Sequence, residues 1–225
     1  PLTVAGAAAA ALLALTLAPV VAVAAASRLD LRFSPGDVAA IRFTVLQAAL
    51  SALFSVALAV PVARALARRR FPGRGLMISA LGAPFLVPTV VAVLGLVAVF
   101  GRAGWLNAVL GTAGLPPVSI WGLHGVVLAH VFLNLPLAVR LILMGWQAIP
   151  AERFRLAQSL GFRAGDHFRH LEWPMLRGVV PGALLVVFAL CLTSFATALT
   201  LGGGPRATTV ELAIYQALRF DFDLA

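Results

Sequence analysis

Polar side chains that could do chemistry lie inside otherwise apolar segments of this chain. They are, in chain order, Gln47, Ser51, His130, Asn134, Thr193, Ser194 and Thr197. Amides, hydroxyls and an imidazole can bind a polar solute, whereas none of the apolar segments around them contains Asp or Glu. Because polar groups within such segments usually face the interior of a helix bundle, they predict a polar cavity. The alternative is helix packing, since Ser and Thr commonly bond a carbonyl one turn back.

A second group of polar residues fills the stretch 150–178, which separates two long apolar segments. Its first part, Glu152–Leu160, favours a helix with an apolar side. That side is formed by Phe154, Leu156, Ala157 and Leu160. Gly161 can end this helix in a left-handed conformation, and a second helix is expected over about 164–171. The stretch therefore predicts a helix–turn–helix surface that docks a soluble partner.

The composition places both groups in a membrane protein. Hydrophobic residues make up 61% of the chain and charged residues only 11%, against roughly 25% charged residues in soluble domains. The net charge is +9, and all 17 basic residues are arginine. In a soluble protein this charge would suggest nucleic acid. Here the arginines stand at the borders of apolar segments, so we expect contact with membrane lipid and no nucleic-acid partner. The single cysteine, Cys191, has no metal-site spacing.

Five apolar segments have about the 20 residues that a membrane-spanning helix needs. They are Leu2–Ala26, Val38–Ala63, Leu76–Phe100, Trp121–Val139 and Val179–Leu201. The alternating pattern of barrel strands is absent, which predicts an all-α membrane protein. We expect one transmembrane domain over residues 1–225.

The arginines predict the orientation of these segments, because cytoplasmic loops are enriched in basic residues. The connections after the second and fourth segments are rich in arginine: Arg64, Arg68, Arg69, Arg70 and Arg74, then Arg153, Arg155, Arg163, Arg169 and Arg177. The other connections are nearly neutral, as in Arg28 and Arg32 against Asp30 and Asp37. We expect the N-terminus and both arginine-rich loops in the cytoplasm and the C-terminal segment outside. This arrangement fits truncation before a sixth helix.

The spacing in 150–178 resembles the coupling loop of ABC importer permeases, which reads Glu-Ala-Ala, three residues, Gly, nine residues, Ile, one residue, Leu-Pro. The matching positions are Arg155, Leu156 and Ala157, then Gly161, Leu171, Trp173 and Pro174. Arg155 thus stands where the family has Glu, and we offer Glu152, one turn earlier, as its substitute. Pro174 is expected to mark a change of chain direction. The resemblance implies that the loop moves with a cytoplasmic ATPase. The alternative is an amphipathic connector on the lipid headgroups.

Four further stretches look like the thiamine (thiamine pyrophosphate) ABC transporter permeases: Arg68–Arg74, Leu128–Pro136, Ser194–Thr197 and Leu201–Leu218. This resemblance implies the N-terminal half of a fused permease, with most of one six-helix type I unit. It also implies a multi-pass protein of the bacterial inner membrane that imports thiamine or its phosphates, with the polar residues of the spans along its translocation path.

The partners implied by the resemblance are a cytoplasmic ABC ATPase dimer, a periplasmic substrate-binding protein and a second permease half. ATP and Mg would be bound by the ATPase, so we expect no cofactor on this chain and no enzyme activity of its own. One alternative is the same architecture carrying ferric iron or a polyamine. A more distant alternative is a membrane-embedded enzyme. Its site would be drawn from Glu152, Asp166, His167, His170 and Glu172.

Overall fold

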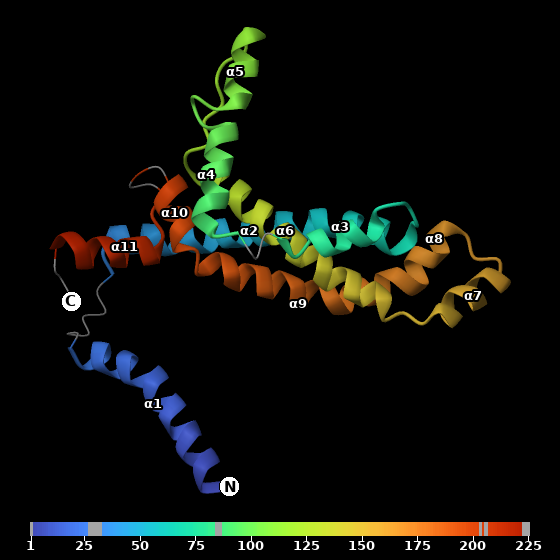
Figure 1. Cartoon of the computed structure of the whole chain (residues 1–225), viewed down its shortest axis with the longest axis horizontal. Coiled ribbons are helices and arrows are strands. Elements are labelled where there is room, and N and C mark those ends of the chain that lie inside the picture. Colours follow the sequence, from blue (N-terminus) through green and yellow to red (C-terminus); the bar gives the residue numbers. More distant parts are fainter. Residues whose placement is uncertain (1, 27–32, 84–86, 203, 205–206, 222–225) are drawn as a thin grey trace.

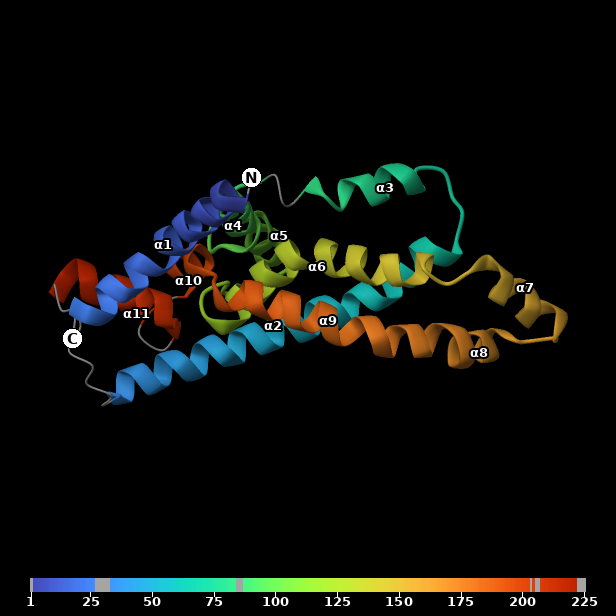
Figure 2. The same ribbon diagram turned by 90° about the horizontal axis from the view of Figure 1, so that it is seen from below.

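The computed structural model describes residues 2–26, 33–83, 87–202, 204 and 207–221, and it contains helices and no strand in these ranges. Its centre is a bundle of three long helices, α2 (Pro35–Arg68), α6 (Leu123–Gln147) and α9 (Trp173–Leu192). They run side by side in both views (Figures 1 and 2). The other helices are α1 (Leu2–Ala26), α3 (Arg74–Ala80), α4 (Thr89–Phe100), α5 (Trp105–Thr112), α7 (Ala151–Ser159), α8 (Ala164–His167), the π-helix η2 (Phe168–Glu172), α10 (Phe195–Leu201), α11 (Val210–Gln216) and the π-helix η4 (Ala217–Asp221). The all-α membrane fold is confirmed.

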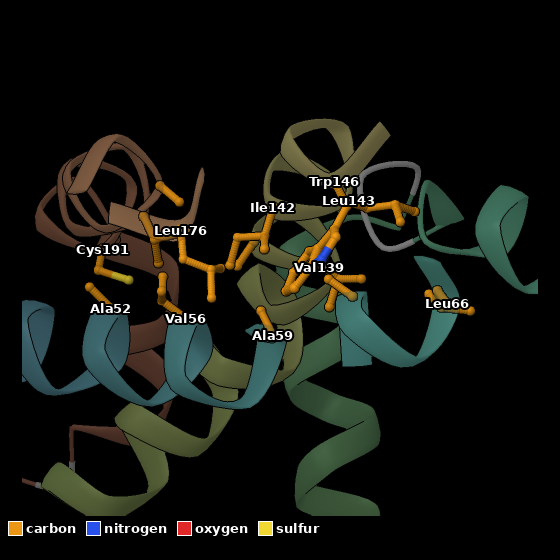
Figure 3. Close-up of a cluster of buried hydrophobic side chains, with 14 of the residues drawn as sticks. Ala52, Val56, Ala59, Leu66, Val139, Ile142, Leu143, Trp146, Leu176 and Cys191 are labelled. Carbon is orange, nitrogen blue, oxygen red and sulfur yellow. The ribbon is translucent and has the colours of Figure 1, made fainter. Parts of the chain in front are cut away.

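Small residues allow the three long helices to pack closely. On α2 the buried positions include Ala52, Ala59 and Ala63, and they belong to the same core as Ile142 and Trp146 of α6. Figure 3 shows Ala52 beside Cys191 of α9. Small residues at helix interfaces let the backbones approach and increase van der Waals contact. This core holds the polar residues of the three helices in fixed register.

Four helical stretches are long and apolar enough to cross a membrane in the part of the chain that is described. They are Pro35–Arg68, Thr89–Thr112, Leu123–Gln147 and Ala164–Leu192. α1 is not among these four, although its 25 residues have the length of a crossing. Figure 1 shows α1 to one side of the bundle. The fifth crossing therefore stays a prediction.

Two of the predicted spans are not continuous helices. The third, Leu76–Phe100, is divided between α3 and α4, and Pro88 stands directly before the first turn of α4. Proline disfavours helical geometry in the residue before it, which accounts for the interruption there. Pro84, another proline of this span, lies outside the described residues. The fifth span, Val179–Leu201, is divided between α9 and α10.

Pro174 does not change the direction of the chain, so that expectation was wrong. The helix runs on from Ala164 to Leu192, and Pro174 occupies the first turn of α9. The preceding turn is the π-helix Phe168–Glu172. A proline inside a helix lacks an N–H and crowds the carbonyl four residues earlier. A wider π-turn directly before it relieves that crowding, and the helix continues.

The arginine-rich connections lie at one end of the bundle, as the arginine distribution predicted. The C-terminal end of α2 and the helices α7 and α8 gather there, whereas α10 and α11 lie at the opposite end (Figures 1 and 2). At that opposite end the backbone N–H of Val210 donates to Thr44 Oγ1 of α2 at 3.0 Å. Arg28, Asp30 and Arg32, which entered the orientation argument, lie outside the described residues. Which end faces the cytoplasm stays a prediction.

Candidate functional site

The interruption between α9 and α10 falls at Thr193 and Ser194, in the middle of an apolar segment. Thr193 has φ −98° and ψ 37°, and Ser194 has φ −108° and ψ 66°. Neither pair of angles is helical. A broken helix at membrane depth is tolerated only where its backbone is covered by protein or lines a cavity. The helix break is therefore the first place to look for a site.

His130 of α6 connects the helix break to α2. Its Nδ1 lies 3.3 Å from Ser51 Oγ of α2, and its Nε2 lies 2.5 Å from Ser194 Oγ. Ser194 Oγ in turn donates to Thr197 Oγ1 at 2.9 Å. With the Ser194 proton used in this way, Nε2 donates to Ser194. In a neutral imidazole Nδ1 then accepts from Ser51, so a neutral ring satisfies all three hydroxyls.

Gln47 and Asn134 contact the end of α9 at Cys191. Gln47 Nε2 donates to the Cys191 carbonyl at 2.9 Å, and Asn134 Nδ2 lies 3.5 Å from Cys191 Sγ. The carbonyls of the last helical turn have no partner within a helix. The Gln47 side chain of α2 therefore donates the hydrogen bond that the Cys191 carbonyl would otherwise lack at the end of α9. Gln47 Oε1 has no partner.

A cavity of about 420 Å³ opens beside the break. Of the predicted path residues, His130, Asn134, Thr193 and Ser194 line it. Gln47, Ser51 and Thr197 are buried behind this wall. Thr193 stays outside the hydrogen-bonded network, because its hydroxyl points back to the carbonyls of Ala189 and Leu190. That network consists of Ser51, His130, Ser194 and Thr197.

The cavity walls offer hydroxyls, an amide and an imidazole, together with the aromatic ring of Phe195. No carboxylate lines the cavity among the described residues. Such a surface can hold a polar or cationic ring by hydrogen bonds and cation–π contact. It lacks the charged oxygens that hard metal cations prefer.

At the other end of the bundle, Gly161 ends α7 in the way that its position predicted. Its φ is +72°, in the left-handed region. The N–H of Phe162 bonds the Ala157 carbonyl at 3.0 Å, and the N–H of Gly161 bonds the Gln158 carbonyl at 3.0 Å. These two bonds form a Schellman motif, which suits glycine at this position. The predicted helix–Gly–helix geometry of the loop is confirmed.

The predicted apolar side of α7 faces two ways. Ala157 is buried and Phe154 is half-buried toward the bundle, whereas Leu156 and Leu160 are more than half exposed. Leu156 and Leu160 are one turn apart and share a face. Farther along the loop Leu171 is half-buried, and Trp173 and Pro174 are exposed. The loop thus presents an exposed apolar pair at its tip.

Glu152 and Arg155 form an ion pair on the exposed side of α7. Arg155 Nη2 lies 2.8 Å from Glu152 Oε1, and the side chains are 73% and 74% exposed. Water screens a pair of this kind, so it contributes little to stability. Both side chains are accessible to a partner.

Glu172 has a role that the sequence interpretation missed. Its side chain is 0% exposed, and Oε2 lies 2.6 Å from Arg64 Nε of α2. Arg68 Nε lies 3.5 Å from Oε1, near enough for attraction but without hydrogen-bond geometry. The available signal was the pair Arg64 and Arg68, one turn apart on α2, with few acidic residues in the facing loop. We call Glu172, Arg64 and Arg68 the ion cluster.

Two aromatic rings of the loop cover the ion cluster. The Arg64 guanidinium lies 5.4 Å from the centre of the Phe168 ring, and the Arg68 guanidinium lies 5.0 Å from that of Phe154. Phe154 belongs to α7 and Phe168 to η2, so both halves of the loop contact α2. Cation–π contact at this distance is attractive and keeps water from the carboxylate. The ion cluster therefore ties the whole loop to the end of α2.

The residues considered for an enzyme site contact other groups and do not form a common cluster. Asp166 accepts from the backbone N–H of Arg163 at 2.9 Å, and His167 lies between the rings of Phe154 and Phe162. The Glu172 carboxylate pairs with the arginines of α2. Among the described residues no three His, Cys, Asp or Glu side chains converge as metal ligands would.

Comparison with known proteins connects this geometry to transport. The chain is 50% identical over 186 residues to a thiamine transport system permease of Brucella abortus and, over the same length, to one of Escherichia coli. Each alignment covers 82% of this chain but only 34% and 35% of the relative. A sulfate transport system permease of Synechococcus elongatus is 29% identical over 78% of this chain and 61% of its own length. No family model matches the sequence. The chain spans about a third of the length of the thiamine relatives, and the predicted resemblance to them is confirmed.

Proposed function

We propose that this chain is a transmembrane part of an ATP-driven importer for thiamine or its phosphates. The observation that carries the proposal is the 50% identity to thiamine transport system permeases across four-fifths of the chain. The apolar helices, the helix break and the helix–Gly–helix loop agree with a permease. We propose further that the chain lies in the bacterial inner membrane with its N-terminus in the cytoplasm, and that it is not itself an enzyme.

The loop 150–178 is proposed to dock onto a separate cytoplasmic ATPase dimer, which binds the ATP and Mg. The exposed leucines Leu156 and Leu160 offer an apolar anchor, and Glu152 with Arg155 offers charges around it. A docked helix transmits movement only if its attachment to the membrane helices is rigid. The buried ion cluster, which holds both halves of the loop on α2, provides that attachment.

The translocation path is proposed to pass the cavity at the helix break. His130, Asn134 and Ser194 would contact the substrate, while Gln47 and Thr197 hold the broken backbone in place. A neutral polar wall suits passage, because it attracts a cationic ring without holding it tightly. The absence of carboxylates from this wall, among the described residues, argues against a polyamine or ferric iron.

The importer is expected to contain a periplasmic substrate-binding protein and a second permease half beside this chain. The α10–α11 end, where Thr44 and Val210 join α2 to the C-terminal segment, is the face proposed for the binding protein.

Reconstitution of the full-length complex tests the proposal. Thiamine-loaded binding protein should stimulate ATP hydrolysis several-fold over the unloaded protein. An iron-loaded binding protein should not. Equal stimulation by both would contradict the substrate assignment, and no stimulation by either would contradict the coupling.

A variant pair tests the path. His130→Leu removes both ring nitrogens from the cavity wall, whereas Thr200→Val removes a hydroxyl that bonds back to the carbonyls of Ala196 and Thr197 in its own helix. We expect thiamine uptake to fall at least several-fold in the first variant and to stay near wild type in the second, at equal amounts in the membrane. Equal uptake by both variants would remove His130 from the path.

A further inference from the structure

A second polar cavity, of about 490 Å³, lies at the arginine-rich end of the bundle. It is enclosed by the ends of α2 and α6 together with α7 and α8. The side chains that matter for its chemistry are Arg68, Arg70, Trp146, Phe154, Gln158 and His167. It is separate from the cavity at the helix break and shares no residue with it.

The cavity wall is rich in hydrogen-bond donors and has no carboxylate among its described residues. Arg70 is exposed and makes no ion pair or hydrogen bond within the described part of the chain, so its five N–H groups are open to a ligand. Gln158 adds an amide. The nearest acid, Glu172, is engaged by Arg64 Nε and faces Arg68 Nε, which leaves the terminal nitrogens of Arg68 for a ligand. The site is therefore positively charged, and it has hydrogen-bond donors without an acceptor among the described residues.

Two buried groups of the wall also lack partners. Trp146 is 4% exposed and His167 is 7% exposed, yet Trp146 Nε1 and His167 Nδ1 have no hydrogen-bond partner. Tryptophan can only donate. Buried polar groups are nearly always satisfied, so an unpaired donor calls for an explanation such as an unseen ligand. An anion in the cavity would accept a hydrogen bond from Trp146 Nε1. It would also accept one from His167 Nδ1 if that nitrogen carries the proton.

We propose that this cavity binds a phosphate group, carried either by an anionic phospholipid of the adjoining leaflet or by a free phosphate compound. Arginine forks match phosphate oxygens in geometry and charge. Basic pockets between transmembrane helices at their cytoplasmic ends bind lipid headgroups in this manner. The Phe154 ring and the Trp146 indole provide an apolar margin for the group that carries the phosphate.

Thermal unfolding of the purified full-length protein tests the site without any transport or ATPase assay. Phosphatidylglycerol added to the detergent micelles should raise the unfolding temperature by several degrees over phosphatidylcholine. Inorganic phosphate, compared with chloride at equal ionic strength, forms the second arm. Protection in the first arm alone identifies a lipid headgroup, and protection in the second identifies a free phosphate. Protection in neither arm overturns the proposal.

Three variants locate the effect. Arg70→Ala and Trp146→Phe each remove a donor from the wall, and each should abolish more than half of the protection. Arg69→Ala is the matched control, since Arg69 is exposed like Arg70 but lines a different cavity. If Arg69→Ala reduces protection as much as Arg70→Ala, the effect is diffuse surface charge and the site is refuted. Because unliganded stability is measured for every variant, a folding defect is separated from lost binding.

Discussion

Two acids of the loop 150–178 pair with arginine at nearly equal distances and in very different surroundings. Arg155 lies 2.8 Å from Glu152 on the exposed face of α7, and Arg64 of α2, which is 43% exposed, lies 2.6 Å from the fully buried carboxylate of Glu172. The distance alone would rank them as equals. Burial decides the difference, because water screens the first pair and is absent from the second carboxylate. The exposed pair is available to a partner, and the buried pair holds the loop to α2.

The largest effect is expected from removing the buried charge. Glu172→Gln leaves Arg64 and Arg68 facing each other without their shared counter-ion. Loss of one partner of a buried ion pair typically costs 3–5 kcal/mol, and the partial exposure of Arg64, 43%, reduces this to about 2 kcal/mol. Unfolding of the purified protein in detergent measures the loss. An unfolding free energy equal to that of wild type would show that the ion cluster is not structural.

Double-mutant cycles sharpen the same comparison. The cycle of Arg64→Ala with Glu172→Gln should give an interaction energy of about 1.5 kcal/mol. The cycle of Arg155→Ala with Glu152→Gln should give about 0.4 kcal/mol. Both cycles are measured by the same unfolding experiment. Equal interaction energies would mean that burial does not separate the two pairs.

Two glycines of the loop, Gly161 and Gly165, provide a second comparison, at the turn between its helices. Gly161 has a positive φ and open space around it, whereas Gly165 has open space and no positive φ. Gly161→Ala should therefore cost about 1 kcal/mol through backbone strain alone. Gly165→Ala, at a helical position of α8, should be neutral or slightly stabilising. If both variants unfold alike, the left-handed turn does not set the loop geometry.

The smallest effect on stability is expected at the exposed pair. Glu152→Gln should change the unfolding free energy by less than about 0.5 kcal/mol. The same variant should weaken binding of the ATPase subunit by about twofold, as a rim charge does. Titration of the ATPase onto the membrane complex measures the affinity. A large loss of stability with unchanged ATPase binding would reverse the assigned roles of Glu152 and Glu172.

The elements that could be predicted from the sequence are those with a local signal. Long apolar runs predicted the helices that became α2 and α6, and the position of Gly161 predicted the turn of the loop. The helix break at Thr193–Ser194 carried no such signal, because the residues there include neither Gly nor Pro, and hydroxyl side chains are common within continuous membrane helices. The break depends on partners from other helices, namely Gln47 and His130.

Pairing over long distances in the sequence explains the other differences. Glu172 and Arg64 are 108 residues apart, and the residues next to each of them in the sequence do not indicate the contact. Pro174 was expected to mark a change of chain direction because proline usually disrupts a helix, yet the helix continues through it after a π-turn. The seven predicted path residues come from α2, from α6 and from the segment 193–197, and they gather around the helix break because α2 and α6 pack against α9. Thr193 lines the cavity, although its hydroxyl bonds back to the carbonyls of Ala189 and Leu190.

Uptake of labelled thiamine into proteoliposomes that contain the full-length permease, its ATPase and its binding protein tests the central claim most directly. We predict accumulation that requires ATP on the loop side of the membrane and thiamine-loaded binding protein on the other. Glu172→Gln should hydrolyse ATP with lowered uptake per ATP, while Glu152→Gln stays near wild type. Accumulation without ATP, or no thiamine accumulation in a complex that hydrolyses ATP normally, would contradict the assignment of this chain to an ATP-driven thiamine importer.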